Sequence, residues 1–156
     1  MERIVYVYGK KNKYTQYLED ILKSKYQIDT IEYETCNNFH ELLLKGDYKY
    51  IIVHNLIGFE QTTLTGGIFY NILNSKIINI LSESNLENEK YLFKQISISM
   101  FFIFLDQNYC EYISENYHHI PYIKEVPSHV TNDTEMENET NILAAIAEII
   151  KECSLS

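Results

Sequence analysis

The sequence has little of what marks several common classes of protein. It contains three cysteines, two prolines, five glycines and no tryptophan in 156 residues. Cys36, Cys110 and Cys153 are scattered without a Cys-x-x-Cys spacing, so we expect reduced thiols in a cytoplasmic protein. No apolar run approaches the roughly 18 residues of a membrane span. The first predicted strand begins at residue 3 or 4, so we expect no signal peptide.

Positive charge is also scarce. The chain has 13 lysine and arginine residues against 22 aspartate and glutamate residues, a formal net charge of −9. Each contact with a nucleic-acid phosphate would have to overcome that field, so we expect no nucleic acid as the main ligand. The same charge disfavours binding to anionic membrane surfaces.

Motifs that would name a cofactor are missing. The loop after the first predicted strand, residues 9–13, is neither a G-x-G-x-x-G fingerprint nor a P-loop. No second histidine lies at metal-ligand spacing from His54, because His40 falls on a predicted helix and His118 and His119 precede a proline turn. We therefore expect no metal site, and the sequence leaves the cofactor unknown.

Apolar segments about one strand long organise the chain. Four are almost wholly apolar and cover residues 4–8, 50–53, 77–81 and 100–105. Their content of Ile, Val, Phe and Tyr suits strands buried on both faces, as in a parallel sheet covered by helices. The alternating segment 28–33 predicts a half-exposed edge strand, and 122–126 predicts a short sixth strand.

Segments with helical periodicity lie between the strands. They predict helices near residues 13–25, 39–45, 68–73, 85–95 and 107–117. We expect Gly46 to follow the end of the second helix, as glycine often does. Ser84 and Glu87 predict a capping box for the fourth helix, and Asp106 predicts an N-cap for the fifth.

This alternation of strands and helices predicts an α/β fold in three layers. We expect a doubly wound, mainly parallel sheet of five or six strands, either flavodoxin-like in the order 2-1-3-4-5 or Rossmann-like. In the preferred order the sixth strand lies at the far edge. A single domain would comprise an α/β core (1–127), an acidic loop (128–140) and a C-terminal helix packed on the core (141–153).

Ligands of such sheets bind beyond the carboxyl ends of the strands, near the point where strand order reverses. The candidate site residues at that edge are Tyr8, Gly9, Lys10, His54, Asn55, Ser82, Glu83 and Asp106. His54 closes a buried strand and is placed to act as a general base, with Glu83 on the neighbouring strand to orient it or raise its pKa. The alternative is that His54 only bonds a loop carbonyl.

The composition of two loops predicts contact with a small anion. Lys10, Lys11 and Lys13 cluster at the start of the first helix, where side-chain charge and free amides suit phosphate or carboxylate. Gly66 and Gly67 would let another helix approach a ligand. The alternatives are a solvated basic turn, an ordinary glycine turn and, for Asp106, a helix cap with no further role.

The run Gly46–Asn55 resembles a strand in the N-terminal half of glycosyltransferases of the GT-B fold. Lys76–Ser82 resembles the strand that follows it. Phe104–Tyr117, and then Ile120–Ile123, resemble the closing helix and the strand that leads to the donor domain. The resemblance spans about residues 2–127 and implies an acceptor-binding half-domain that needs a second, catalytic part.

The sequence therefore predicts a small cytoplasmic binding or accessory domain that acts at the carboxyl edge of its sheet. Its partner would be a small anionic or nucleotide-type ligand, or another protein. A glycosyltransferase-like acceptor domain and a purely structural interaction module are the alternatives. A homo- or hetero-oligomer that completes the site with a second subunit is consistent with such a fold.

Overall fold

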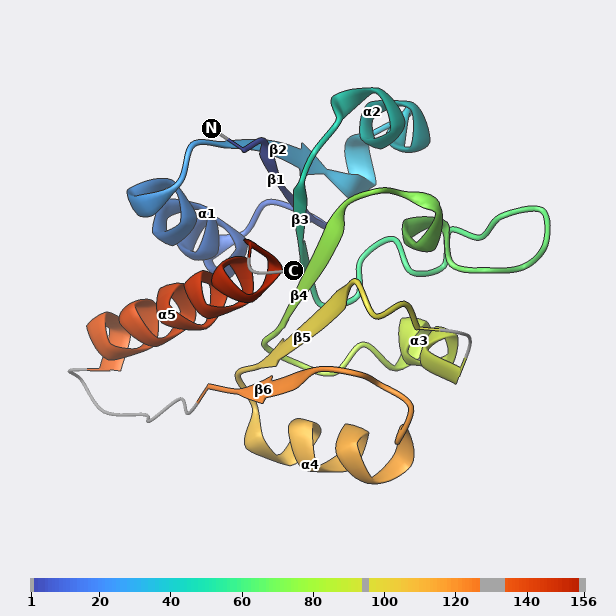
Figure 1. Cartoon of the computed structure of the whole chain (residues 1–156). Helices are drawn as coiled ribbons and strands as arrows, with labels where there is room; N and C mark the ends of the chain where they lie inside the picture. Colours follow the sequence, from blue (N-terminus) through green and yellow to red (C-terminus); the bar gives the residue numbers. More distant parts are fainter. Residues whose placement is uncertain (1, 94–95, 127–133, 155–156) are drawn as a thin grey trace.

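The computed structural model describes residues 2–93, 96–126 and 134–154. Its strands are β1 (Ile4–Tyr8), β2 (Ile28–Glu32), β3 (Tyr50–His54), β4 (Lys76–Leu81), β5 (Met100–Phe104) and β6 (Ile123–Glu125). All are parallel and follow the order β2-β1-β3-β4-β5-β6 (Figure 1). The predicted α/β class and the preferred strand order, with the sixth strand at the far edge, are confirmed.

Helices cover both faces of the sheet (Figure 1). They are α1 (Lys13–Lys25), α2 (Phe39–Gly46), α3 (Leu86–Glu89), α4 (Gln107–Asn116) and α5 (Thr134–Ser154), with 3-10 turns η1 (Tyr33–Thr35), η2 (Phe69–Ile72) and η3 (Lys90–Phe93). Because strand side chains alternate between faces, Tyr6 and Ile52 pack beneath α1 and α5. Val7 and Val53 belong to the opposite core, beneath α2, η2 and α4.

The start of α1 fixes the loop that follows β1. Asn12 caps the helix, since its Oδ1 accepts from the Thr15 amide at 2.9 Å while Thr15 Oγ1 accepts from the Asn12 amide at 2.8 Å. Thr15 Oγ1 also donates to the Lys10 carbonyl at 3.0 Å. Buried Leu18 and Leu22 hold the helix against the sheet. The loop is thereby held over the carboxyl end of β1.

Two predicted helix ends are wrong. Gly46 is the last residue of α2 and does not follow its end; Asp47 takes the left-handed conformation that ends the helix, with φ of 51°. A Cβ at Gly46 would collide with the Tyr48 ring, which explains the glycine there. Asn85, not Ser84, caps the next helix; α3 is short and passes directly into η3, so no continuous helix spans 85–95.

The third predicted helix is also wrong, because residues 69–72 form only the 3-10 turn η2. The Phe69 amide donates to the Gln61 carbonyl at 2.8 Å, and the Tyr70 hydroxyl donates to the Ile57 carbonyl at 2.6 Å. These bonds hold the segment against the preceding loop. Gly66 and Gly67 lie in the hairpin turn between the bridged residues Thr62 and Ile68.

The C-terminal helix belongs to the core. On α5, Ile142, Ala145, Ile146 and Ile149 are buried against the sheet and α1. The helix begins at Thr134 rather than near 141, because each residue added to a docked helix gains a backbone hydrogen bond even where the sequence is polar. Residues 128–133 of the predicted acidic loop lie outside the described residues.

Candidate functional site

A cleft of 540 Å³ opens where β1, β3 and β4 end. Its lining includes Gly9, Lys10 and Asn12 after β1, Glu34 in η1, His54 and Asn55 at the end of β3, and Glu83, Asn85 and Glu87 after β4. The strand order reverses between β1 and β3, so the cleft lies at the switch point where sheets of this kind bind ligands. The structure thus brings Gly9, Lys10, His54, Asn55 and Glu83 together, as predicted for this edge.

His54 forms the most unusual part of the lining. It is the last residue of β3, is 8 % exposed, and its Nε2 lies 3.0 Å from Ser82 Oγ. The Tyr14 ring stacks on the imidazole with centroids 5.7 Å apart. Loss of solvent lowers the pKa of His54 to about 4, so the prediction that Glu83 raises this pKa is wrong. The imidazole is therefore neutral near pH 7.

Asn55 joins the ends of β3 and β4. Its Oδ1 accepts from the Ser82 amide at 2.8 Å and from the Glu83 amide at 3.4 Å. Its Nδ2 donates to Ser82 Oγ at 3.2 Å. One side chain thus fixes the start of the β4–α3 loop relative to His54.

The turn after His54 has a strained backbone. Asn55 and Leu56 both have positive φ, 51° and 61°, which costs about 1–2 kcal/mol for a residue other than glycine. Asn85 Nδ2 donates to the Asn55 carbonyl at 2.9 Å, and Asn88 Nδ2 donates to the Leu56 carbonyl at 3.0 Å. Two asparagines from the next segment therefore hold the strained turn in place.

The His54–Ser82 pair has the spacing of a base and a nucleophile, but its surroundings favour binding over covalent catalysis. Ser82 Oγ also accepts from Asn55 Nδ2. The amides of Ser82 and Glu83, which would be candidates to hold an oxyanion, already donate to Asn55. What faces the cleft is a neutral, fixed imidazole.

The charges of the lining are mixed. Lys10 contributes an ammonium group, whereas Glu34, Glu83 and Glu87 contribute carboxylates. Lys11 is held by its backbone, since its amide donates to Glu32 Oε2 at 3.1 Å. The cleft is therefore not a basic pocket.

Other predicted site residues lie elsewhere. Tyr8 packs in the core beside Tyr6, with ring centroids 5.3 Å apart. Asp106 caps α4, because its Oδ1 accepts from the Tyr109 amide at 2.9 Å. Gly66 and Gly67 belong to the 62–68 hairpin. Of the described residues that line the cleft, none belongs to this group.

Sequence reasoning missed three residues of the site. Tyr14 shares the helical spacing of the core residues of α1, so its contact with His54 had no separate signal. Asn85 and Asn88 have the spacing of a helix cap, since Asn85 Oδ1 accepts from the Asn88 amide at 3.2 Å. The competing Ser84–Glu87 pattern, one residue earlier, hid this signal.

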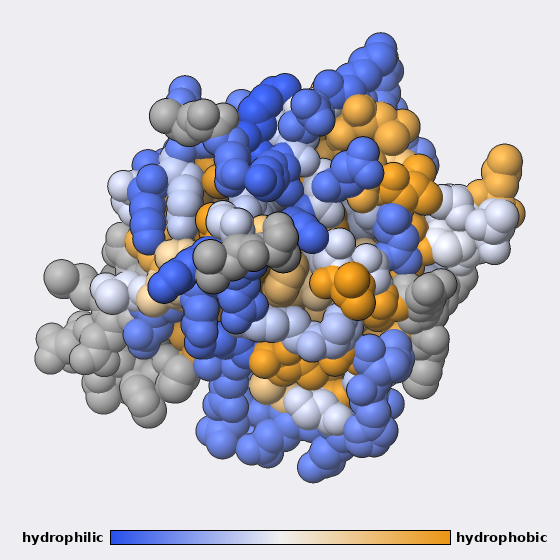
Figure 2. Space-filling model, in the orientation of Figure 1, coloured by the Kyte–Doolittle hydropathy of each residue, from blue (hydrophilic) through white to orange (hydrophobic). Residues whose placement is uncertain are grey.

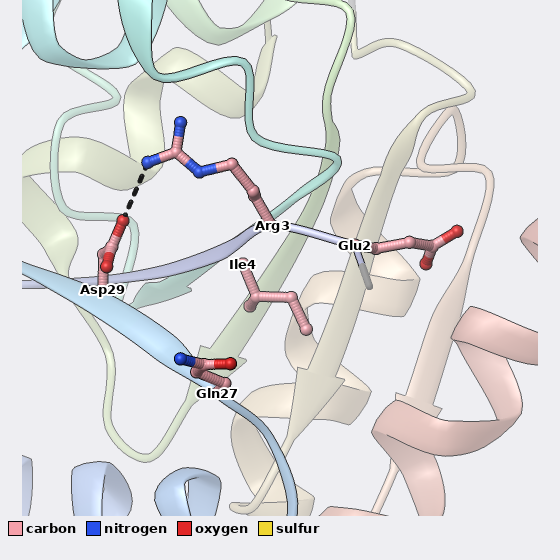
Figure 3. A pocket seen from close by; sticks show the side chains of 5 residues that line it. All are labelled: Glu2, Arg3, Ile4, Gln27 and Asp29. Carbon is pink, nitrogen blue, oxygen red and sulfur yellow. Dashed lines mark hydrogen bonds and ion pairs between the residues drawn. The ribbon is translucent and has the colours of Figure 1, made fainter.

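A smaller cavity of 240 Å³ lies at the opposite, amino edge of the sheet (Figure 3). Arg3 Nη2 lies 3.1 Å from Asp29 Oδ2, and the Arg3 guanidinium lies over the Tyr48 ring. Figure 3 shows Arg3 turned toward Asp29 and Glu2 directed away from it. The guanidinium is thus engaged in joining β1, β2 and the segment before β3.

Comparisons with protein-family models, curated proteins and solved structures found no match. The six-stranded parallel sheet is consistent with a flavodoxin- or Rossmann-like fold, the coarser part of the predicted resemblance. Over the described ranges, no cluster of three or more His, Cys, Asp and Glu side chains is placed to hold a metal. None of the described helices has both the length and the apolarity needed to cross a membrane.

Proposed function

We propose that this protein is a binding domain whose small polar ligand occupies the cleft beside His54. One observation carries the proposal: a neutral histidine lines the cleft, held by Ser82 and by a strained turn that follows it. Strained backbone concentrates at binding and catalytic sites, where the surrounding contacts maintain it. The position at the switch point and the volume, within the usual 300–1,000 Å³ or so of ligand sites, support the same function.

The lining favours a ligand with at most one anionic group. Lys10 suits a single carboxylate or phosphate, as the sequence predicts. Glu34, Glu83 and Glu87 would repel further negative charge. A nucleoside diphosphate or triphosphate is therefore a weaker candidate than a monoanion or a neutral molecule.

A thermal-shift panel of carboxylates, monophosphates, sugars and nucleotides tests the proposal. A ligand at about 100 times its Kd should stabilise the protein by about 2.7 kcal/mol. We expect the ligand-induced shift to disappear in His54→Gln and to persist in His118→Gln, an exposed histidine outside the cleft. An equal shift in wild type and His54→Gln would contradict the proposal.

A glycosyltransferase-like acceptor-binding half-domain is a second candidate. A neutral imidazole can take a proton from an acceptor hydroxyl, and Glu83 lines the same cleft. Because Ser82 occupies Nε2, the hydroxyl would have to reach the other ring nitrogen or displace Ser82. Sugar transfer that is lost in His54→Ala would favour this candidate over simple binding.

The surface around α2 supports a third candidate, an interaction module for a partner protein. Leu44 on α2, Ile72 on η2 and Leu64 in the 62–68 hairpin are exposed large apolar side chains. Figure 2 shows hydrophobic surface over α2 and the adjoining η2 region. Loss of a partner in Leu64→Ser, with ligand binding at His54 unchanged, would separate this function from the first.

A further inference from the structure

A second cavity of 610 Å³ adjoins the cleft on the side of α2. Glu34 lines both cavities, so they meet at η1. The Glu34 amide donates to the Gly9 carbonyl at 3.0 Å, which fixes η1 to the end of β1. The remaining lining of the second cavity includes Tyr33, Asn37, His40 and Gln61.

Hydrogen bonds between side chains hold this second cavity in shape. His40 Nε2 lies 2.8 Å from Gln61 Oε1, and Gln61 Nε2 donates to the Tyr33 hydroxyl at 2.6 Å. The Tyr33 hydroxyl in turn donates to Glu60 Oε1. Ordering several polar side chains that are partly or fully exposed costs conformational entropy, so such a network indicates a prepared surface.

The same network reaches the turn beside His54. Glu60 Oε2 accepts from Asn88 Nδ2 at 3.0 Å, and Asn88 also holds the Leu56 carbonyl. The Asn88 amide donates to Oδ1 of Asn85, which lines the cleft, at 3.2 Å, so one connected set of hydrogen bonds includes side chains of both cavities. This continuity and the shared Glu34 support one elongated site that comprises both cavities.

We infer that this elongated site takes an uncharged, hydroxyl-rich chain of the oligosaccharide class, an inference that rests on the proposed function. Amide side chains such as Asn37 and Gln61 both donate and accept hydrogen bonds, and Glu34 accepts them. A hydroxyl group donates and accepts, and so matches this mixture. An ammonium group only donates, and a phosphate would be repelled by Glu34 and Glu41.

Calorimetric titration with glucose and N-acetylglucosamine oligomers of one to three units tests the inference. We expect the trisaccharide of the preferred series to bind at least tenfold more tightly than the monosaccharide, because it fills both cavities. Gln61→Ala and His54→Gln should each weaken trisaccharide binding several-fold, whereas only one of the two should weaken monosaccharide binding. Gln107→Ala, which removes an exposed glutamine bonded to Glu111 on α4, should change neither.

Trisaccharide binding that is no tighter than monosaccharide binding, or that is unchanged in Gln61→Ala, would overturn the inference. So would binding of spermidine alone with an affinity that falls steeply as salt rises, since this would mark a cationic ligand. If another ligand still binds in a His54-dependent way, only the inference fails. If no ligand depends on His54, the proposed function fails as well.

Discussion

The Tyr14 ring lies against the imidazole of His54, with 5.7 Å between centroids and 27° between planes. Tyr14 stands in the first turn of α1, between the two residues of the Asn12–Thr15 capping box. Burial raises the pKa of Tyr14 to about 12, with a hydrogen bond to Ser82 opposing part of the rise. The tyrosine therefore stays protonated and helps to exclude water from His54.

Removing this ring should change the titration of His54. We expect Tyr14→Ala to raise the pKa of His54 from about 4 toward the usual 6.5, because the imidazole regains solvent. Tyr14→Phe keeps the ring and should leave the pKa near 4. NMR of the imidazole carbons over pH 3–8 measures both variants. A pKa of His54 near 6.5 in the wild type would refute this description of the site.

The lowered pKa also predicts how stability depends on pH. Above about pH 6.5, His54 is neutral in both the folded and the unfolded chain and contributes no pH dependence. Between about 6.5 and 4 only the unfolded chain takes up the proton, so the free energy of unfolding falls as pH falls, by on the order of 3 kcal/mol, and levels off below 4. Urea unfolding at several pH values gives the free energy of unfolding of wild type and His54→Gln. Between about pH 6.5 and 4 this free energy should fall more steeply with falling pH in the wild type than in the variant. The same pH dependence in both proteins would contradict the prediction.

Two substitutions of Asn55 should separate the contribution of its hydrogen bonds to stability from the cost of its backbone strain. Asn55→Gly loses the bonds to the Ser82 and Glu83 amides but tolerates positive φ, and should cost about 2–3 kcal/mol. Asn55→Ala loses the same bonds and adds strain, so it should be about 1 kcal/mol less stable than the glycine variant. Urea unfolding measures both. Equal stability of the two variants would mean that the turn has relaxed.

Asn79 is a polar residue in the middle of the core. It lies fully buried in β4 between Val53 and Phe102 on neighbouring strands, and neither its Nδ2 nor its Oδ1 has a hydrogen-bond partner among the described residues. Because a buried unpaired amide is costly, Asn79→Val should raise the free energy of unfolding by about 1–3 kcal/mol. A decrease of similar size would show that Asn79 binds an internal water.

The sheet could be predicted from the sequence because its signal is local. Residues 4–8 and 77–81 are buried on both faces, so composition and length alone indicate strands. Short connections and parallel pairing then leave few strand orders. The same logic placed His54 and Asn55 at the carboxyl edge.

The errors came where long-range contacts outweighed local patterns. Residues 68–73 have apolar residues at helical spacing, but the bond from Tyr70 to the Ile57 carbonyl holds them in a 3-10 turn. The left-handed turn at Asn55 and Leu56 has no local signal, because its stabilising partners, Asn85 and Asn88, come from a different segment. The second cavity depends on the same kind of contact, between η1, α2 and the 57–61 loop.

Chemical-shift mapping tests the central claim most directly. In ¹⁵N-labelled protein titrated with the panel ligand that gives the largest thermal shift, we expect the largest changes at the amides of Gly9, Asn12, Asn55 and Asn85 and in the His54 ring. Changes confined to the Arg3 cavity, to the hairpin or to α4 would contradict the assignment of the cleft as the ligand site.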